Sequence, residues 1–560
     1  MIQQMKTKHI LAIGLSFCLF NTFAQENQSD SLVIDQIDIV KKYQYAIKKV
    51  KKLDTQPQFL DSNFITSTFS YELPLVGNRE SEPITSSINQ AFFKLDSDSS
   101  KTPTYSNYII GAFSTKANPF AELSFAEELD NFKFGLFGQY HADNQKDNED
   151  PFFGFEHARL NGYLDYLKEN LLFQSEFGFK NQEENLVQDL GTRYDYDKIS
   201  YQNYNAKIGI ENLSKRSFLK HLFLEYKGLQ EKNNNSENYL HLGAGISDYL
   251  AQESLLWRVN FNYHLSVNEM DDNTFDNNLG LLDITPQIQG DHEKLYYTIG
   301  LNTIMAWDDN HLGKNGTTYL IPDISLTYRF DKTLNLNAGF KADYELYNYI
   351  NIQNINPYLT EDGLNTKTRV SKLAYANLDG IISGIKYQIG GQYNIGSNRL
   401  FYQTEAINSH IYEAYYETGD YMALTVNLDY QYTKNISLQL SATAQQYHLD
   451  SKAKASHTPA LIAHLKSLYQ MNTQLAFYGT LNFATKQYMI SNSKFNDPTA
   501  RSIQKTIDPR FDLSLGAHYD IKPQWRIFAE VNNVFNNKYE RWGSYLHKGA
   551  YFTGGFRFKF

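Results

Sequence analysis

From Tyr108 to the C-terminal Phe560, apolar and polar residues alternate along the chain with a period of two. In segment 334–341, for example, Leu, Ala and Phe residues alternate with Asn, Gly and Lys residues. A period of two places successive side chains on opposite faces of a β-strand. The pattern therefore predicts a chain made of many strands, each with one apolar and one polar face.

The alternation alone does not say what covers the apolar face. A soluble sandwich buries that face inside, whereas a membrane barrel turns it toward lipid. The chain contains 42 Tyr and 37 Phe but only 13 Pro, which is an excess of residues that favour strands. After the N-terminal region no apolar run approaches the roughly 20 residues of a membrane helix. The remaining interpretations are a transmembrane barrel and a large secreted sandwich or propeller.

The lengths of the connectors favour the barrel, because short and long connectors alternate along the chain. The short ones are residues 129–131, 168–170, 331–332, 383–384, 433–435 and 522–524. The long ones are residues 142–155, 181–198, 267–278, 347–371, 396–420 and 484–510. Short periplasmic turns and long external loops are typical of outer-membrane barrels. We predict an all-β, antiparallel, up-and-down transmembrane barrel of about 22 strands over residues 105–560.

The N-terminal region differs from the barrel. Residues 1–24 have lysines before a short apolar run and end in small residues, which indicates a signal peptide. The only cysteine, Cys18, lies in this peptide, so the mature chain has no thiol or disulfide chemistry. Residues 25–104 have weak periodicity and a basic run. They are predicted to form an N-terminal extension with solvated lysines or, alternatively, a reduced plug.

The last strand carries a specific signal. Phe552, Phe556, Phe558 and Phe560 share one face of the segment that ends the chain. A terminal Phe on an alternating strand resembles the recognition signal of outer-membrane barrels. We therefore predict Phe556, Phe558 and Phe560 to be a barrel-assembly signal, with the barrel assembly machinery, outer-membrane lipid and lipopolysaccharide as partners. The predicted location is the cell outer membrane.

A longer motif lies just before the last strand. Residues 530–540 read Glu-Val-Asn-Asn-Val-Phe-Asn-Asn-Lys-Tyr-Glu and are followed by Trp542, Tyr545, Gly549 and a Gly-Gly pair. This segment resembles the end of the barrel domain in TonB-dependent receptors. The resemblance implies a 22-stranded barrel and transport of a solute or polypeptide across the outer membrane, with TonB as a candidate partner.

The chain departs from that family before the barrel. Family members carry a globular plug larger than residues 25–104 could form, and segment 37–40 is only a short apolar stretch of the character that a TonB-binding motif needs. An unplugged barrel of this size would leave a wide lumen, so the extension, inward-folded loops or a partner must occlude it. The alternative function is a structural or scaffold barrel subunit of an outer-membrane protein complex.

No catalytic or cofactor motif is present. The sequence has no zinc-binding His-Glu-x-x-His, nucleophile elbow or phosphate-binding loop, and its 14 His are dispersed. Acidic clusters in the predicted loops lack the spacing of a calcium site. We therefore predict no enzyme activity, no metal site and no cofactor. The formal net charge of -10 argues against nucleic acid as a partner.

Aromatic residues in the long connectors are the remaining candidates for a site. Tyr358, Phe401, Tyr402, Tyr412 and Tyr415 are predicted to lie on extracellular loops, where they could stack on an external ligand. The alternative is that they extend the aromatic girdle at the membrane edge.

Overall fold

The computed structural model describes residues 107–560 apart from 117, 144–153, 190–193, 215–216, 233–234, 251–254, 270–276, 311–312, 332, 360–365, 405–409, 452–453, 492–502, 544 and 548. The predicted signal peptide (residues 1–24), the predicted extension (residues 25–104) and its segment 37–40 lie outside the described residues. In the part of the chain that is described, no helix has the length and apolarity needed to cross a membrane.

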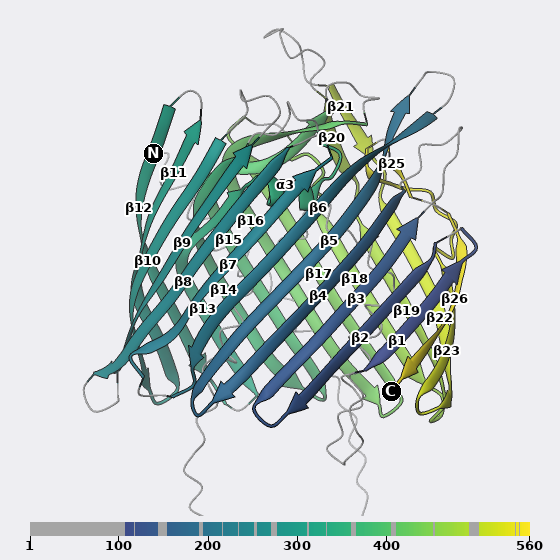
Figure 1. The fold of residues 1–560 in the computed structure, drawn as a ribbon, viewed down its shortest axis with the longest axis horizontal. Helices are drawn as coiled ribbons and strands as arrows, with labels where there is room; N and C mark the ends of the chain where they lie inside the picture. The colour runs from purple at the N-terminus through teal and green to yellow at the C-terminus, as the bar shows by residue number, and fades with distance from the viewer. Residues whose placement is uncertain are drawn as a thin grey trace, which may run out of the picture. The chain divides into compact units, whose positions relative to one another are not determined.

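The strands form a closed antiparallel barrel (Figure 1). Each of β1 to β18 pairs with the next strand, and the ring continues from β19 to β22, β23 and β26. β26 then pairs with β1, from Tyr108↔Lys559 to Ser114↔Thr553. Of the 24 strands in this sheet, only β20 and β21 lie outside the ring. The barrel therefore has 22 strands, as predicted.

The ring consists of 22 strands with the following bounds: β1 (Tyr108–Ser114), β2 (Phe120–Leu129), β3 (Phe132–Asp143), β4 (Phe155–Lys168), β5 (Leu171–Asp189), β6 (Tyr194–Asn212), β7 (Leu219–Glu231), β8 (Ser236–Leu250), β9 (Leu255–Glu269), β10 (Asn277–His292), β11 (Leu295–Asn310), β12 (Gly313–Arg329), β13 (Leu334–Tyr347), β14 (Lys367–Ile382), β15 (Ile385–Thr404), β16 (Tyr412–Thr433), β17 (Ile436–Leu449), β18 (Leu461–Gln470), β19 (Leu475–Ala484), β22 (Arg510–Lys522), β23 (Trp525–Asn532) and β26 (Tyr551–Lys559). In the described residues, the elements outside the ring are α3 (Tyr349–Ile355), β20 (Gln487–Ser491), β21 (Ile503–Ile507), β24 (Glu540–Trp542) and β25 (Tyr545–Leu546).

The predicted alternation sorts side chains between the outer and inner faces of the wall. On β12, Leu320, Ile324 and Leu326 are exposed on the outer face, whereas Thr327 is buried on the inner face. In water an exposed row of this kind would be costly, but in a bilayer it contacts hydrocarbon. The polar inner row faces the lumen. The barrel is thus a transmembrane barrel of the outer-membrane type, and the predicted fold class and location are confirmed.

The connectors agree with the predicted ones at one end of the barrel and differ partly at the other. Tight turns connect β2 to β3 and β4 to β5, where Asp130 and Glu169 take positive φ angles of 45° and 56°. The predicted long connectors 181–198 and 396–420 are mostly strand. β5 runs to Asp189 and β6 begins at Tyr194, whereas β15 runs to Thr404 and β16 begins at Tyr412. These strands are longer than the 9–11 residues that cross a bilayer, so a polar sequence there marks strand beyond the lipid.

The end of the chain helps to close the ring. Phe552, Phe556 and Phe560 are exposed on the outer face of β26, whereas Arg557 is buried on the inner face. The backbone N–H of Phe560 donates to the carbonyl oxygen of Asn107 at 3.0 Å. The predicted Phe face is therefore present, and its role as an assembly signal stays a prediction.

That role can be tested by deleting Phe560. We expect the amount of folded, heat-modifiable barrel in the outer membrane to fall several-fold, because the terminal aromatic residue would no longer be presented to the assembly machinery. The matched control is Phe552→Ala, since Phe552 is exposed on the same face to a similar degree (47% against 44%) but is not terminal. Equal losses from the two variants would mean that only membrane contact matters.

Candidate functional site at the capped mouth

The five predicted aromatic residues lie at the end of the barrel that carries the longer connectors. Tyr358 follows α3, Phe401 and Tyr402 lie near the end of β15, and Tyr412 and Tyr415 lie at the start of β16. Three of them, Tyr358, Tyr402 and Tyr412, belong to one buried cluster. The other two face each other nearby, with the rings of Phe401 and Tyr415 5.7 Å apart. Their role in ligand binding stays a prediction.

Four pieces of chain meet around this cluster, and we call them the mouth cap: segment 348–359 with α3, segment 454–460, strand β20, and the pair β24 and β25. Backbone contacts connect them to the wall and to each other. β20 pairs in parallel with the end of β15 at Gln403↔Ile490. The N–H of His457 donates to the Tyr488 carbonyl at 2.7 Å, and the N–H of Tyr412 donates to the Tyr358 carbonyl at 2.8 Å.

Aromatic stacking and buried hydroxyls hold the cap together. The rings of Tyr358 and Tyr545 are stacked with centroids 4.0 Å apart. Trp542 packs edge-on against Tyr402 and Tyr412, each at 5.3 Å. The Tyr412 hydroxyl donates to the Gly543 carbonyl at 2.6 Å. Burying these rings removes a large apolar area from water, while the hydroxyls of Tyr402, Tyr412 and Tyr545 keep hydrogen-bond partners.

The cluster reaches across the mouth of the barrel. Besides residues of the cap, it contains Phe155 on β4, Val187 on β5 and Leu400 on β15. β5 and β15 are the fifth and fifteenth strands of a ring of 22, and therefore lie on nearly opposite sides of it. Side chains from such distant strands can share one buried cluster only if the connectors fold inward over the lumen.

α3 anchors the cap to a third part of the wall. The carboxylate of Glu237 on β8 accepts the backbone N–H groups of Tyr349 and Ile350 at 3.2 and 2.6 Å. The Tyr349 hydroxyl donates to Glu231 on β7 at 2.5 Å, and the Tyr201 hydroxyl on β6 donates to the Pro357 carbonyl at 2.9 Å. Strands β6, β7 and β8 thus each supply a buried hydrogen-bond partner that fixes segment 348–359 to the wall.

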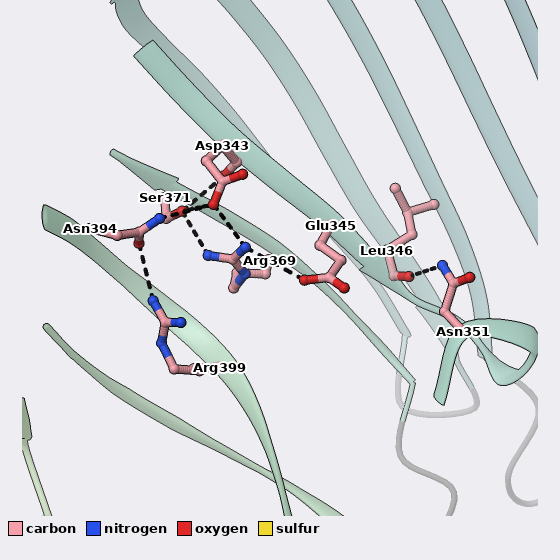
Figure 2. Close-up of polar contacts among 8 residues, drawn as sticks. All are labelled: Asp343, Glu345, Leu346, Asn351, Arg369, Ser371, Asn394 and Arg399. Carbon is pink, nitrogen blue, oxygen red and sulfur yellow. Dashed lines mark hydrogen bonds and ion pairs between the residues drawn. The ribbon is translucent and has the colours of Figure 1, made fainter. Parts of the chain in front are cut away.

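Next to the cap, a charged network covers the inner faces of β13, β14 and β15 (Figure 2). Arg369 binds Asp343 at 2.8 Å and lies 3.5 Å from Glu345. Asn394 donates to the same Asp343 carboxylate at 2.9 Å and accepts from Arg399 at 3.2 Å. The charges of this network compensate one another within the wall, where Arg369, Asn394 and Arg399 are all buried.

Several residues of the site were missed in the sequence. Trp542 and Tyr545 carry the C-terminal resemblance, but that motif does not indicate that they belong to the cap. His457 and Glu237 have no sequence signal, since a single His or Glu in a connector is usually solvated. Their partners lie far away in the chain, so only the structure brings them together.

The histidines near the connectors do not gather into a metal centre. His157 contacts Glu184 at 2.7 Å, and the ring of His141 packs edge-on against Phe155 at 4.7 Å. Among the described residues no three or more His, Cys, Asp or Glu side chains are placed to hold a metal ion.

We predict that Tyr545→Ala loosens the cap, because it removes the stacking partner of Tyr358 and leaves a cavity. Truncating a buried aromatic residue costs about 3–5 kcal/mol. In a chain that keeps Trp542 as its only tryptophan, acrylamide quenching of Trp542 fluorescence should rise several-fold. Tyr432→Ala, which removes a ring that is 62% exposed outside the cap, should leave quenching unchanged. Unchanged quenching in the Tyr545 variant would argue against a packed cap.

The cap is also predicted to weaken in acid. His457 is buried 4.9 Å from Trp542, and burial lowers the pKa of its imidazole from 6.5 to about 3. An opened cap takes up this proton below about pH 6.5, whereas the closed cap does not until about pH 3. The contribution of neutral His457 to the stability of the closed cap is therefore complete above about pH 6.5 and is lost progressively as the pH falls toward 3.

The measurement is quenching of the single Trp542 between pH 7 and pH 4. It should increase in the parent chain and change much less in His457→Asn, which keeps a side chain that tolerates the positive φ of 54° at this position. His448→Asn, at the end of β17, is the control and should behave like the parent chain. The same pH dependence in His457→Asn would assign it to another group.

No family model matches the chain. Its structure is similar to the pyoverdine outer membrane receptor FpvA of Pseudomonas aeruginosa, with a TM-score of 0.60 and 12% identity over 82% of this chain and 79% of that chain. It is also similar to a variant of the ferric enterobactin receptor PfeA of Pseudomonas aeruginosa in complex with enterobactin, with a TM-score of 0.59 and 12% identity over 81% of each chain. At this identity the likeness concerns the fold, and the described residues therefore form the 22-stranded barrel fold of the TonB-dependent receptors.

Proposed function

We propose that this protein is an outer-membrane transport receptor that takes up a solute through its capped mouth and passes it along the polar lumen. The observation that carries the proposal is the pairing of a wide barrel with a cap that spans its mouth. A barrel of 22 strands encloses a lumen far wider than a small molecule needs. A closed cap on such a lumen suits selective entry better than free diffusion.

The proposed solute is a ferric siderophore. The two structures compared above are named as receptors for pyoverdine and for ferric enterobactin, and both share this fold. We propose that Tyr358, Phe401, Tyr402, Tyr412 and Tyr415 contact the solute when the cap opens, and that Arg399 on the lumen wall attracts an anionic complex. Arg399 suits this role because its guanidinium lies over Tyr421 at 4.8 Å and is held toward Asn394.

Binding can be tested with ferric enterobactin and ferric pyoverdine as probes on the purified full chain. One of them should bind, and Arg399→Gln should weaken that binding about tenfold, since a charge-assisted contact contributes roughly 1.5–3 kcal/mol. Arg526→Gln is the matched control, because Arg526 is paired with Asp520 near the turn between β22 and β23. Absence of binding to both probes would reject this solute class.

Energy coupling is proposed to run through TonB and segment 37–40. In cells that lack their own siderophore receptors, the chain should support uptake of labelled iron with the siderophore it binds. Ile39→Pro should abolish uptake without changing binding, whereas Leu60→Pro in the same N-terminal region should preserve both. A chain that neither binds nor transports and instead copurifies stoichiometrically with envelope proteins would support the scaffold alternative.

A further inference from the structure

The wall of the barrel is interrupted between β12 and β13. These strands form a ladder of six residue pairs that ends at Ile324↔Phe340. Beyond that pair, β12 continues alongside β11 up to Gly313, and β13 continues alongside β14 up to Tyr347. We call the unpaired stretch between them the seam. It lies in the half of the barrel that carries the cap.

Pro322 explains where the ladder stops. The N–H of Phe330, in the turn after β12, donates to the carbonyl of Leu334 at the start of β13. Because backbone groups alternate sides along a strand, the even-numbered residues of β12 direct theirs toward β13. Pro322 is the next even position after Ile324, and it has no N–H to donate. The ladder therefore ends at the residue that cannot extend it.

Side chains replace the missing strand along the edge of β13. The N–H of Ala342 donates to the side-chain oxygen of Asn302 on β11 at 3.1 Å. The carbonyl of Leu346 accepts from the side-chain amide of Asn351 in α3 at 2.8 Å (Figure 2). Backbone groups left unpaired at membrane depth are costly, so these side chains allow the two strands to separate at little cost.

The seam is sealed by an apolar overlap of two layers. Ala342, Leu346 and Val370, on the outward side of β13 and β14, are buried together with inward-facing residues of β10, β11 and β12. Those inward-facing partners are Leu279, Leu281, Ile304 and Ile321. Elsewhere the inner face is rich in polar groups, so an apolar lining at this place is specific to the seam.

The position of the seam places part of it in the bilayer. Spanning a membrane takes about 9–11 residues of a tilted strand, whereas only six pairs of the β12 and β13 ladder precede the seam on the side of the tight turns. The seam therefore begins within the outer half of the hydrocarbon layer. Leu320, two residues beyond the break, is 65% exposed on the outer face.

A strand edge that is open at this depth could pair with a β-strand of a partner protein or bind the hydrocarbon chain of a lipid-like molecule. A strand is disfavoured, because Pro322 removes a donor from the edge of β12 and side chains already occupy groups on the edge of β13. We propose that the seam is a lateral portal that admits the hydrocarbon chain of an amphiphile from the outer leaflet. The apolar overlap is its binding surface. This inference does not depend on the proposed siderophore uptake.

The test joins the two sides of the seam with a disulfide bond after the protein has folded. Asp308 on β11 and Thr368 on β14 face each other across the overlap, with side-chain oxygens 3.4 Å apart. We would replace both with Cys and oxidise the folded chain in liposomes. The control pair is Thr298→Cys with Ser325→Cys, which are direct neighbours in the regular β11 and β12 ladder. The native cysteine lies in the predicted signal peptide, so no other thiol competes.

The probe is palmitate carrying a photoreactive diazirine, and labelled residues are mapped by mass spectrometry. We expect labelling at Ile304, Ile321 and Leu346, which are shielded in the closed seam, to fall about tenfold on oxidation of the Asp308/Thr368 pair and to return on reduction. The control pair should not change it. The proposal would be overturned if labelling were confined to exposed residues around the whole barrel. It would also be overturned if labelling of the buried residues were the same with and without the disulfide between positions 308 and 368. Recovery of a partner peptide cross-linked to β12 instead of palmitate would also overturn it.

Discussion

The fold depends on pairing every backbone N–H and C=O group within the sheet, because hydrocarbon offers these groups no alternative partner. The pairing of β26 with β1 meets that requirement by closing the ring. Alternate side chains must then point outward, where apolar residues contact lipid, and the others point into a polar lumen. Where the ladder of β12 and β13 stops, Asn302 and Asn351 supply side-chain partners for Ala342 and Leu346.

The cap follows a different physical rule from the wall. It is held by buried aromatic rings and by a small number of buried hydrogen bonds, such as those from the α3 backbone to Glu237. Tyr358 and Tyr545 provide stacking, and their neighbours provide hydroxyl groups with specific partners. A neutral His457 fits this setting because a charged imidazole would lose its hydration there.

Most of the wall could be predicted from the sequence, because alternation and turn length are local properties. The strand number and the tight turns at Asp130 and Glu169 follow from them. Connector 181–198 was not predicted correctly, since polarity also marks strands that extend beyond the lipid. The cap could not be predicted, because Tyr358 and Tyr545 meet only through the closed ring. The seam has a local cause in Pro322, but its apolar seal needs residues from five different strands.

The way in which the cap is built constrains the order of folding. Its buried cluster takes residues from β4, β5, β15 and the pair β24 and β25, which are far apart in the chain and come together only around a finished ring. Segment 348–359 must therefore wait until the strands on both sides of the mouth have been inserted. In a half-assembled barrel the ring is still open. The last strand to join closes the ring and also completes the surface against which the mouth cap packs.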